Sequence, residues 1–427
     1  MSGTVTSNVF KASGVIAATP GGLDWSSAVI TGSTLSAETG RGYFINTTSN
    51  ICTVTLPASP EIGDQIVFAD YARTWATYNL IIDSNGNNFQ GDPDTFTVDY
   101  STAGQSLNIV YSDATKGWIP VSDDAVANVP VAPPTQRGIF AFGDTGSAVG
   151  MSNLMNSSGV IGNDVSAVGS AYYSVGATAY GSDKAIYAYG NTGSGYTSKS
   201  NLVSNEGVVA SDTTGVGTAK TSPAAATYGT SGTALFGYGL SASTQVNETN
   251  KVSSAGVIAT DTTGVGTSRE SLGAAAYGTG LAIFAFGNTG SDSGTNVSNL
   301  VSNEGVVASD TSGVGTSRYA IAGISYGGDK AVFSGGYVTG VGTTAVTNKV
   351  SNVGVVASDT SGVGTVRYYL AASSYGGDKG AFAYGRQGGT RYNIKNLVSN
   401  TAVVSADVTG VGTARSNLAG AGYSTSA

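Results

Sequence analysis

The chain has 427 residues, with 19 Lys and Arg against 27 Asp and Glu, so its net charge is −8 and charged residues make up only 11%. Glycine fills 63 positions, about twice its usual share. This composition excludes a coiled coil, a long helical bundle and a charge-rich disordered chain, since each needs abundant Glu, Lys or Arg. The chain has no His and a single Cys, Cys52, which excludes a His catalytic base, an internal disulfide and a Cys–His zinc site.

Residues 1–38 are weakly patterned, and we expect them to form an extended N-terminal arm. The first residues, MSGTVTSNVFKASG, lack the basic segment and the apolar stretch of a signal peptide. No run of 18 apolar residues occurs that could cross a membrane as a helix. The sequence therefore predicts a soluble protein that is made in a cytoplasm and does not insert into a membrane.

Residues 39–123 hold seven strand-like runs bounded by turn residues, which predicts a small β-sandwich. Residues 124–136 contain three of the nine prolines and no strand pattern, and this predicts a stiff linker. Residues 1–136 contain 4 basic and 12 acidic side chains and so carry the whole net charge. Because phosphate binding needs a basic patch, we do not expect this part to bind nucleic acid. The strand-like runs are 42–48, 51–56, 65–71, 80–83, 96–100, 107–111 and 118–121.

From residue 137 onwards three sequence blocks recur in phase, six times each. An aromatic strand ends, at spacings of 47 to 49 residues, in Gly143, Gly190, Gly239, Gly287, Gly336 and Gly385. The motif Asp-Thr-Thr/Ser-Gly-Val-Gly-Thr, with looser first and last copies, begins at Asp164, Asp212, Asp261, Asp310, Asp359 and Asp407. A third block centres on Asn153, Asn201, Asn250, Asn299, Asn348 and Asn396. The recurrence indicates one folding unit repeated six times.

Each period contains four strand-like segments separated by turns, which is the pattern of a β-propeller blade. The first period starts at Arg137 with a second strand that has no first strand before it. The last residues, 415–423, form a first strand with no second strand after it. Pairing these two segments closes a ring and removes exposed sheet edges. The sequence thus predicts an all-β fold, with the N-terminal sandwich followed by a six-bladed propeller over residues 137–427.

The repeat resembles a divergent kelch repeat, because a basic residue precedes the first strand, Tyr-Gly-Gly follows it, and an apolar–aromatic strand ends in Gly. It departs from that family by lacking Trp in the propeller part. The segment GRGYFINTTSNICTVTLPASPEIGDQIVFADY, joined to such repeats, resembles tail-fibre and appendage proteins of bacteriophages, especially those of marine and cyanobacterial phages (cyanophages).

The resemblance implies a viral structural protein, a tail fibre or similar appendage, that is located in the virion after synthesis in the host cytoplasm. We expect the N-terminal region to anchor it on other virion proteins and the propeller to bind a host-surface glycan or protein. We also expect a homo-oligomer, for which a trimer fits. Two alternatives stay open: a decoration of the neck, head or tail that binds no receptor, and a hydrolase of surface polysaccharide.

The chemistry of the repeats argues against an enzyme. Their Ser-Asp-Thr-Thr-Gly differs from the Asp-box turn of sialidases in the position of Gly, and Gly-Val-Gly-Thr lacks the Lys of a P-loop. Glycoside hydrolysis needs two carboxylates, or a Tyr nucleophile with a carboxylate partner, and no acidic cluster stands out from the repeat. We therefore predict no enzyme activity, no cofactor and no metal site. The recurring Asp residues are expected to cap their own turns. The recurring basic residues are expected to form hydrogen bonds between blades or to pair with carboxylates, and they are Lys220, Arg269, Arg318, Arg367 and Arg415.

A single binding site is expected where the repeats differ, which is in the loops between second and third strands. In a kelch-like blade these loops share one face with the Gly-Val-Gly-Thr connections. Tyr and Arg combine a large contact area with hydrogen-bonding tips, so they favour recognition. The receptor contacts that the sequence predicts are Tyr196, Lys199, Tyr337, Arg386, Arg391 and Tyr392.

Overall fold

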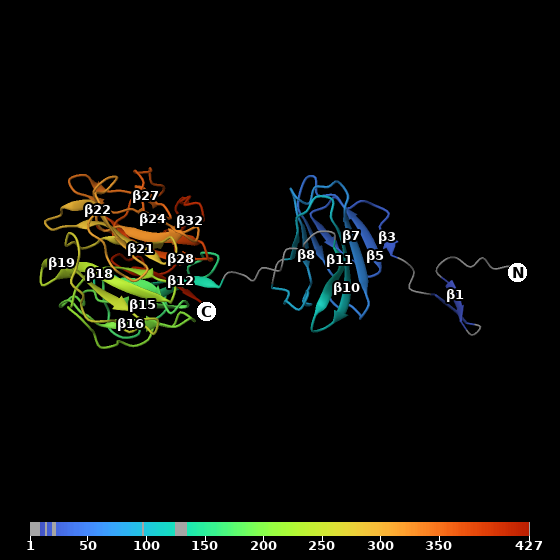
Figure 1. Ribbon diagram of the computed structural model, residues 1–427, viewed down its shortest axis with the longest axis horizontal. Coiled ribbons are helices and arrows are strands. Elements are labelled where there is room, and N and C mark those ends of the chain that lie inside the picture. The colour runs from blue at the N-terminus through green and yellow to red at the C-terminus, as the bar shows by residue number, and fades with distance from the viewer. Residues whose placement is uncertain (1–8, 13–14, 19–22, 96–97, 124–134, 427) are drawn as a thin grey trace. The chain divides into compact units, whose positions relative to one another are not determined.

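The computed structural model describes residues 9–12, 15–18, 23–95, 98–123 and 135–426, and within these ranges it contains strands and no helix. The prediction of an all-β protein is confirmed. The chain divides into two compact units, Met1–Pro133 and Pro134–Ala427 (Figure 1). Residues 124–134 of the predicted linker lie outside the described residues. Gln136, the last residue of that linker, already belongs to a strand of the second unit.

The N-terminal unit contains two mixed sheets that share one hydrophobic core. One sheet has the order β11-β10-β7-β5-β3 and the other β4-β6-β8-β9. From β3 to β8 successive strands alternate between the two sheets, and the pairs that they form within each sheet are parallel. The hairpin β1 (Val9–Ala12) and β2 (Val15–Ala18) comes first, followed by β3 (Asp24–Trp25), β4 (Thr34–Ser36), β5 (Arg41–Ile45), β6 (Cys52–Thr55), β7 (Gln65–Asp70), β8 (Leu80–Asp83), β9 (Val98–Tyr100), β10 (Ser106–Asp113) and β11 (Gly117–Asp123).

All seven strand-like runs of this unit form strands, but the boundary of the expected arm differs. Strands β3 and β4 lie within residues 1–38, and they pair with β5 and β6. They are only two and three residues long and mostly exposed, so they carry no alternating pattern that the sequence could reveal. Cys52 is fully buried in the core, and burial raises the pKa of its thiol to about 11, so it acts as a packing residue.

The C-terminal unit contains six antiparallel sheets with the same order, in which a first strand pairs with a second and the second with a third. We number them sheets one to six along the chain. The predicted fourth strand forms only single bridges, such as Val398 with Val404, so it follows the sheet edge without extending the ladder. Sheets one to three are β33 (Ala419–Ser424), β12 (Gln136–Ala141) and β13 (Ser152–Met155); β14 (Gly176–Tyr180), β15 (Lys184–Ala188) and β16 (Ser200–Val203); β17 (Ala224–Tyr228), β18 (Thr233–Ser241) and β19 (Thr244–Val252).

Sheets four to six repeat this order, and two short hairpins are added in the loops of sheets five and six. These sheets are β20 (Gly273–Tyr277), β21 (Leu281–Asn288) and β22 (Gly294–Val301); β23 (Ala322–Tyr326), β24 (Lys330–Ser334) and β27 (Thr347–Val350); β28 (Ala371–Tyr375), β29 (Lys379–Ala383) and β32 (Lys395–Val398). The added hairpins are β25 (Tyr337–Val338) with β26 (Gly342–Thr343), and β30 (Arg386–Gln387) with β31 (Thr390–Arg391).

The two ends of the C-terminal unit meet in sheet one, as the sequence predicts. Strand β33 pairs with β12 from Gln136↔Ser424 to Ala141↔Ala419, and the C-terminus lies beside β12 in Figure 1. The first strands of neighbouring sheets contact one another in a full circuit, from β33 through β14, β17, β20, β23 and β28 back to β33. Each sheet therefore has two neighbours. These contacts show a circuit of six sheets, whereas the kelch-like propeller remains a prediction.

Two rings of six backbone hydrogen bonds tie the sheets together, one at each end of the first strands. In the axial ring, at the start of these strands, each N–H donates to the equivalent carbonyl of the preceding sheet over 2.6–3.1 Å. In the turn ring, at their far end, each N–H donates over 2.7–3.0 Å to the turn of the next sheet or, where the next sheet is sheet one, to Gln136 at the start of β12. The axial ring consists of Ser174, Ser222, Ser271, Ala320, Tyr369 and Asn417, all with φ between 52° and 56°.

The recurring Asp, Asn, Thr and Arg residues meet in one network in sheets four, five and six, where Arg269, Arg318 and Arg367 each donate to the recurring Asn. In sheet four, Arg269 donates to the Asn299 amide oxygen over 2.6 Å, and the Asn299 amide nitrogen donates to Asp310 over 2.8 Å. The other Asp310 oxygen accepts from the Thr267 hydroxyl over 2.5 Å. The guanidinium of Arg269, which is fully buried, lies 4.2 Å from the ring centre of Tyr238 in sheet three. Burial of this cation is tolerated because it is both hydrogen-bonded and stacked.

The Asp residues do not cap their own turns, and this corrects the sequence prediction. The Thr or Ser that ends one copy of the motif donates to the Asp that begins the next copy, and Thr413 of the last copy donates to Asp164 of the first over 2.6 Å. We call this set of contacts the Asp–Thr ring. Each contact joins residues 42 or more positions apart, so no local pattern could reveal it. Its pairs are Ser170–Asp212, Thr218–Asp261, Thr267–Asp310, Thr316–Asp359, Thr365–Asp407 and Thr413–Asp164.

The first prediction concerns ring closure. Deletion of 415–427 removes β33, the Arg415 side chain and one member of the axial ring. Only β12 and β13 then remain in sheet one, and a two-stranded sheet is marginally stable alone. We expect the C-terminal unit to lose its cooperative thermal transition in far-UV circular dichroism. All three Trp residues lie in the N-terminal unit, so the Trp fluorescence transition should stay unchanged and serves as an internal control. A normal circular dichroism transition in the deletion variant would contradict the closed arrangement.

The second prediction concerns acid. Burial would raise the pKa of the six ring Asp carboxyls, but hydrogen bonds from Thr, Ser and Asn outweigh it and hold each pKa below its usual range. Their contribution to stability is therefore present above about pH 4 and is lost as pH falls towards the depressed folded values. Urea unfolding followed by circular dichroism should show the C-terminal unit weakening between pH 5 and pH 3. The Asp310→Asn variant should show a shallower pH dependence, and a pH-independent midpoint in the native protein would refute the prediction.

Candidate functional site

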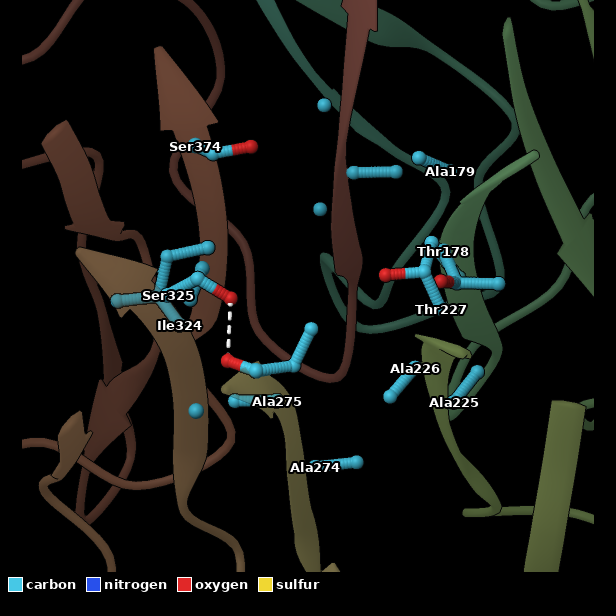
Figure 2. Close-up of a pocket in the computed structure, with 17 residues that line it drawn as sticks. Thr178, Ala179, Ala225, Ala226, Thr227, Ala274, Ala275, Ile324, Ser325 and Ser374 are labelled. Atoms are coloured by element: carbon cyan, nitrogen blue, oxygen red, sulfur yellow. Dashed lines mark hydrogen bonds between the residues drawn. The ribbon is translucent and has the colours of Figure 1, made fainter. Parts of the chain in front are cut away.

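Along the axis of the C-terminal unit the six first strands enclose a small cavity of about 100 Å³. Figure 2 shows that short side chains surround it, with Thr178 and Thr227 on one side and Ser325 and Ser374 on the other. The Ser325 hydroxyl donates to the Ala276 carbonyl over 2.8 Å, the bond drawn dashed in Figure 2. Ligand sites usually have about 300–1,000 Å³, so this cavity is too small for a saccharide.

A larger pocket of about 730 Å³ lies at the loop face, which is the end of the unit that carries the axial ring and the second-to-third-strand loops. Its walls come from sheets one, two and six, namely the loop from Asp144 to Ala148, the loop from Thr192 to Ser194, and the hairpin β30–β31. Three axial-ring residues, Ser174, Tyr369 and Asn417, also line it. This pocket is the candidate binding site.

The Gly-Val-Gly-Thr connections lie on the same face, as the sequence predicts. The carbonyl of Gly315 accepts a hydrogen bond of 2.8 Å from the Asn296 side chain at the base of a second-to-third-strand loop. A Cβ atom at Gly313 would come within 1.8 Å of the Asn296 carbonyl oxygen, so the connection requires Gly where it meets that loop. The variable loops therefore stand on a uniform base.

Arg386 is held in the pocket wall by aromatic rings. Its guanidinium carbon lies 4.8 Å from the ring centre of Tyr368 and 5.2 Å from that of Tyr369. Tyr368 contacts Tyr337 in turn, and Tyr337 contacts Tyr319, each pair with tilted rings whose centres lie 5.5 Å apart. Within the described residues the side chain of Arg386 has no hydrogen bond or ion pair, and its Nε is a buried donor without a partner. Such a donor costs free energy until an acceptor reaches the group.

Arg391 lies directly opposite Arg386 in the β30–β31 ladder and pairs with an acid from sheet one. Its Nη2 lies 2.8 Å from Oδ2 of Asp144, and the two side chains are 25% and 17% exposed. The other carboxylate oxygen of Asp144 accepts the Gly146 N–H over 2.6 Å. The ion pair thus fixes sheet six to sheet one across the wall of the pocket.

Tyr369 is the unusual member of the axial ring. The other five sheets have Ser, Ala or Asn at this position, and its φ of 52° is rare for a bulky side chain. Burial raises the pKa of the Tyr369 phenol, and a hydrogen bond with Ser271 of sheet four opposes that shift. The Tyr369 side chain therefore reaches from sheet six towards Ser271 of sheet four.

The structure brings two of the six predicted contact residues into this pocket, Arg386 and Arg391. Lys199 instead donates to Asp212 over 2.9 Å and to Ser170 over 3.2 Å, so it supports the Asp–Thr ring. Tyr337 is not among the lining residues, and its ring contacts those of Tyr319 and Tyr368. The half-buried Tyr196 and Tyr392 are not among the lining residues.

Sequence reasoning missed Asp144, Tyr173, Tyr369 and Asn417, which all line the pocket. Tyr369 could have been found, because it is the one large residue in a repeat position that otherwise holds small ones. The loop comparison passed over that position because it lies just before a first strand. Asp144 carried no signal, since its partner Arg391 lies 247 residues away and is brought close only by the pairing of β33 with β12.

The lining residues include two arginines and one carboxylate, that of Asp144. Within the part of the chain that the structure describes, no group of three or more His, Cys, Asp or Glu side chains lies close enough together to hold a metal ion. Across the same residues no helix is long and apolar enough to cross a membrane.

No protein-family model matches the chain, and no curated protein matches it either. Its function has to be inferred from the geometry of the pocket and from the repeats.

The third prediction concerns the ion pair across the pocket wall. Asp144→Asn and Arg391→Gln should each destabilise the C-terminal unit, because each leaves a partly buried charge without its partner. Sheet three has Gln245 at the position equivalent to Arg391, so we expect Arg391→Gln to fold. In a double-mutant cycle by urea unfolding, the double variant should lose less than the sum of the single variants, with a coupling of about 0.5–3 kcal/mol. Additive losses would mean that the pair adds no stability.

Proposed function

We propose that the C-terminal unit is a six-bladed, kelch-like β-propeller that binds a saccharide on the surface of a host cell. The closed circuit of first strands, the two backbone rings and the Asp–Thr ring support six blades. On this proposal the N-terminal unit is a small β-sandwich, and the whole chain is an appendage of a bacteriophage particle, such as a tail fibre.

The observation that carries the binding role is the pocket at the loop face. Its volume of about 730 Å³ suits a saccharide of a few residues. Its wall offers a Tyr ring and two guanidinium groups, which can stack on a sugar and donate to its hydroxyls. Of the lining residues only Asp144 is acidic, and Arg391 occupies it, whereas most glycoside hydrolases need two carboxylates. Binding without hydrolysis is the function that this arrangement supports best.

The position of the chain's own connection also favours the loop face. Thr135 bonds Ser424 over 2.8 Å, and Gln136 accepts a hydrogen bond from Gly376 in the turn ring. The chain therefore joins the C-terminal unit at the turn face, which is opposite to the pocket.

A specific observation supports a second candidate function, a decoration that packs against other virion proteins. Six equivalent valines, one in each sheet, are 56–65% exposed after the third strands. Repeated exposure of an apolar side chain suits contact with another protein more than contact with water. These residues are Val160, Val208, Val257, Val306, Val355 and Val403.

The fourth prediction separates the two functions. Tyr369→Ser removes an aromatic ring that lines the pocket but introduces the residue already present at this position in three other sheets, so folding should be retained. We expect the fluorescently labelled full-length variant to bind host cells at least tenfold more weakly, about 1.4 kcal/mol. Loss of the ring should lower the melting temperature, so a native far-UV circular dichroism spectrum and a cooperative transition above the assay temperature are required as proof of folding. Lys379→Gln, at the turn face of the same sheet, is the control and should bind as the native protein does.

Unchanged cell binding by folded Tyr369→Ser would reject the pocket as the receptor site. Absence of cell binding by the native protein, together with antibody labelling of the neck, head or tail in averaged images of the particle, would favour the decoration. Labelling at the distal end of a fibre is the result that the receptor-binding proposal requires.

A further inference from the structure

Two arginines of the pocket face each other at the same level of a short ladder, and only one of them has an anionic partner. Arg386 and Arg391 are paired in β30–β31, an arrangement that like charges disfavour. Asp144 neutralises Arg391 from sheet one. No carboxylate within the described residues pairs with Arg386. The pocket wall thus has one cation more than it has anions.

The surroundings of Arg386 hold it ready for a ligand. The rings of Tyr368 and Tyr369 both hold the guanidinium in cation–π contacts. A cation–π contact engages the face of a guanidinium and supplies no acceptor for its N–H groups, and none of the hydrogen bonds of the described residues uses those of Arg386. Its Nε is buried without a partner, as is that of Arg391, so the absence of an ion pair is what distinguishes Arg386. A planar carboxylate can accept two parallel N–H bonds from such a group, which a hydroxyl cannot do.

The repeat shows that Arg386 is not needed for folding. The equivalent positions of the other five sheets, each bridged in the same way to the residue before the axial ring, are Asp144, Asn191, Leu240, Asn288 and Tyr337. The backbone therefore accepts a polar, apolar, acidic or aromatic side chain there. A stacked arginine without a partner, at a position that has no structural requirement for it, points to a ligand.

We infer that the pocket binds an acidic saccharide, in which a sugar carboxylate pairs with Arg386 while the sugar ring packs on Tyr369. This inference rests on the proposed function, because it names the chemical class of the saccharide. A neutral glycan would leave the N–H groups of Arg386 without a charged acceptor. A phosphate or sulfate group on a sugar would supply charge without the planar carboxylate geometry.

The test uses the full-length protein and a panel of saccharides with matched derivatives. Trisaccharides of galacturonate, glucuronate, mannuronate and guluronate, and a sialyl trisaccharide, are each compared with their methyl esters by calorimetry. Neutral, sulfated and phosphorylated trisaccharides complete the panel. We expect at least one acid to bind, and its methyl ester to bind at least tenfold more weakly.

Substitutions then assign the effect to Arg386. Arg386→Asn introduces the residue of sheets two and four, and it should weaken binding of that acid at least tenfold while leaving the affinity for its ester unchanged. Arg386→Lys keeps the charge without the planar group, and should lose affinity for the acid as well. Lys379→Gln removes one positive charge from the turn face of the same sheet and should bind as the native protein does, so a general electrostatic effect would be recognised.

Each outcome decides the inference. Equal binding of acid and ester, full affinity in Arg386→Asn, or preference for sulfated or phosphorylated sugars overturns it. Binding of neutral saccharides alone also overturns it but leaves the proposed function standing. If the native protein binds host cells and no saccharide of the panel, then the saccharide part of the proposed function fails together with the inference.

Discussion

The C-terminal unit depends on the contact between the Thr that ends one copy of the repeated motif and the Asp that begins the next. A three-stranded sheet of short strands buries too little apolar surface to be stable alone, so each sheet needs both neighbours. The Asp–Thr ring satisfies the polar groups where one sheet passes to the next, and it closes only because Thr413 reaches Asp164. The recurring Asn and basic residues extend this contact into the interior, where Arg415 donates to the Phe142 carbonyl across the junction of the two chain ends.

Most of the architecture could be predicted from the sequence because it follows from local periodicity. The alternation of small and aromatic residues specified the second strands, and the phase of the two ends specified the pairing of β12 with β33. The role of the recurring Asp could not be predicted in the same way. A carboxylate next to Thr and Gly in sequence satisfies the rules for a turn cap, whereas its actual donor lies one whole repeat away. Strands β3 and β4 were missed because two or three exposed residues carry no periodicity.

The binding pocket was predictable only in part, for a related reason. Searching where repeats differ is sound, and it led to Arg386 and Arg391. It also led to Lys199, which differs between the repeats yet serves the Asp–Thr ring of sheet two. Variation between repeats alone does not distinguish a residue that contacts a ligand from one that compensates for another substitution within the fold. In sheet two the ring Thr is replaced by Ser170, and Lys199 donates both to that Ser and to its Asp partner.

The pocket lies where the sixfold regularity is broken most strongly. Sheets six, one and two meet there, sheet one is assembled from both ends of the unit, and sheet six carries the one aromatic residue of the axial ring. An axial ring of backbone hydrogen bonds places no demand on the side chain, provided that the residue tolerates a positive φ, and this freedom allows Tyr369 to extend across the axis. Because the axial ring is formed by backbone atoms, the side chains at its six positions can vary without loss of these hydrogen bonds. A ligand site on such a scaffold can change its specificity through a few side chains while the contacts that hold the six sheets together stay the same.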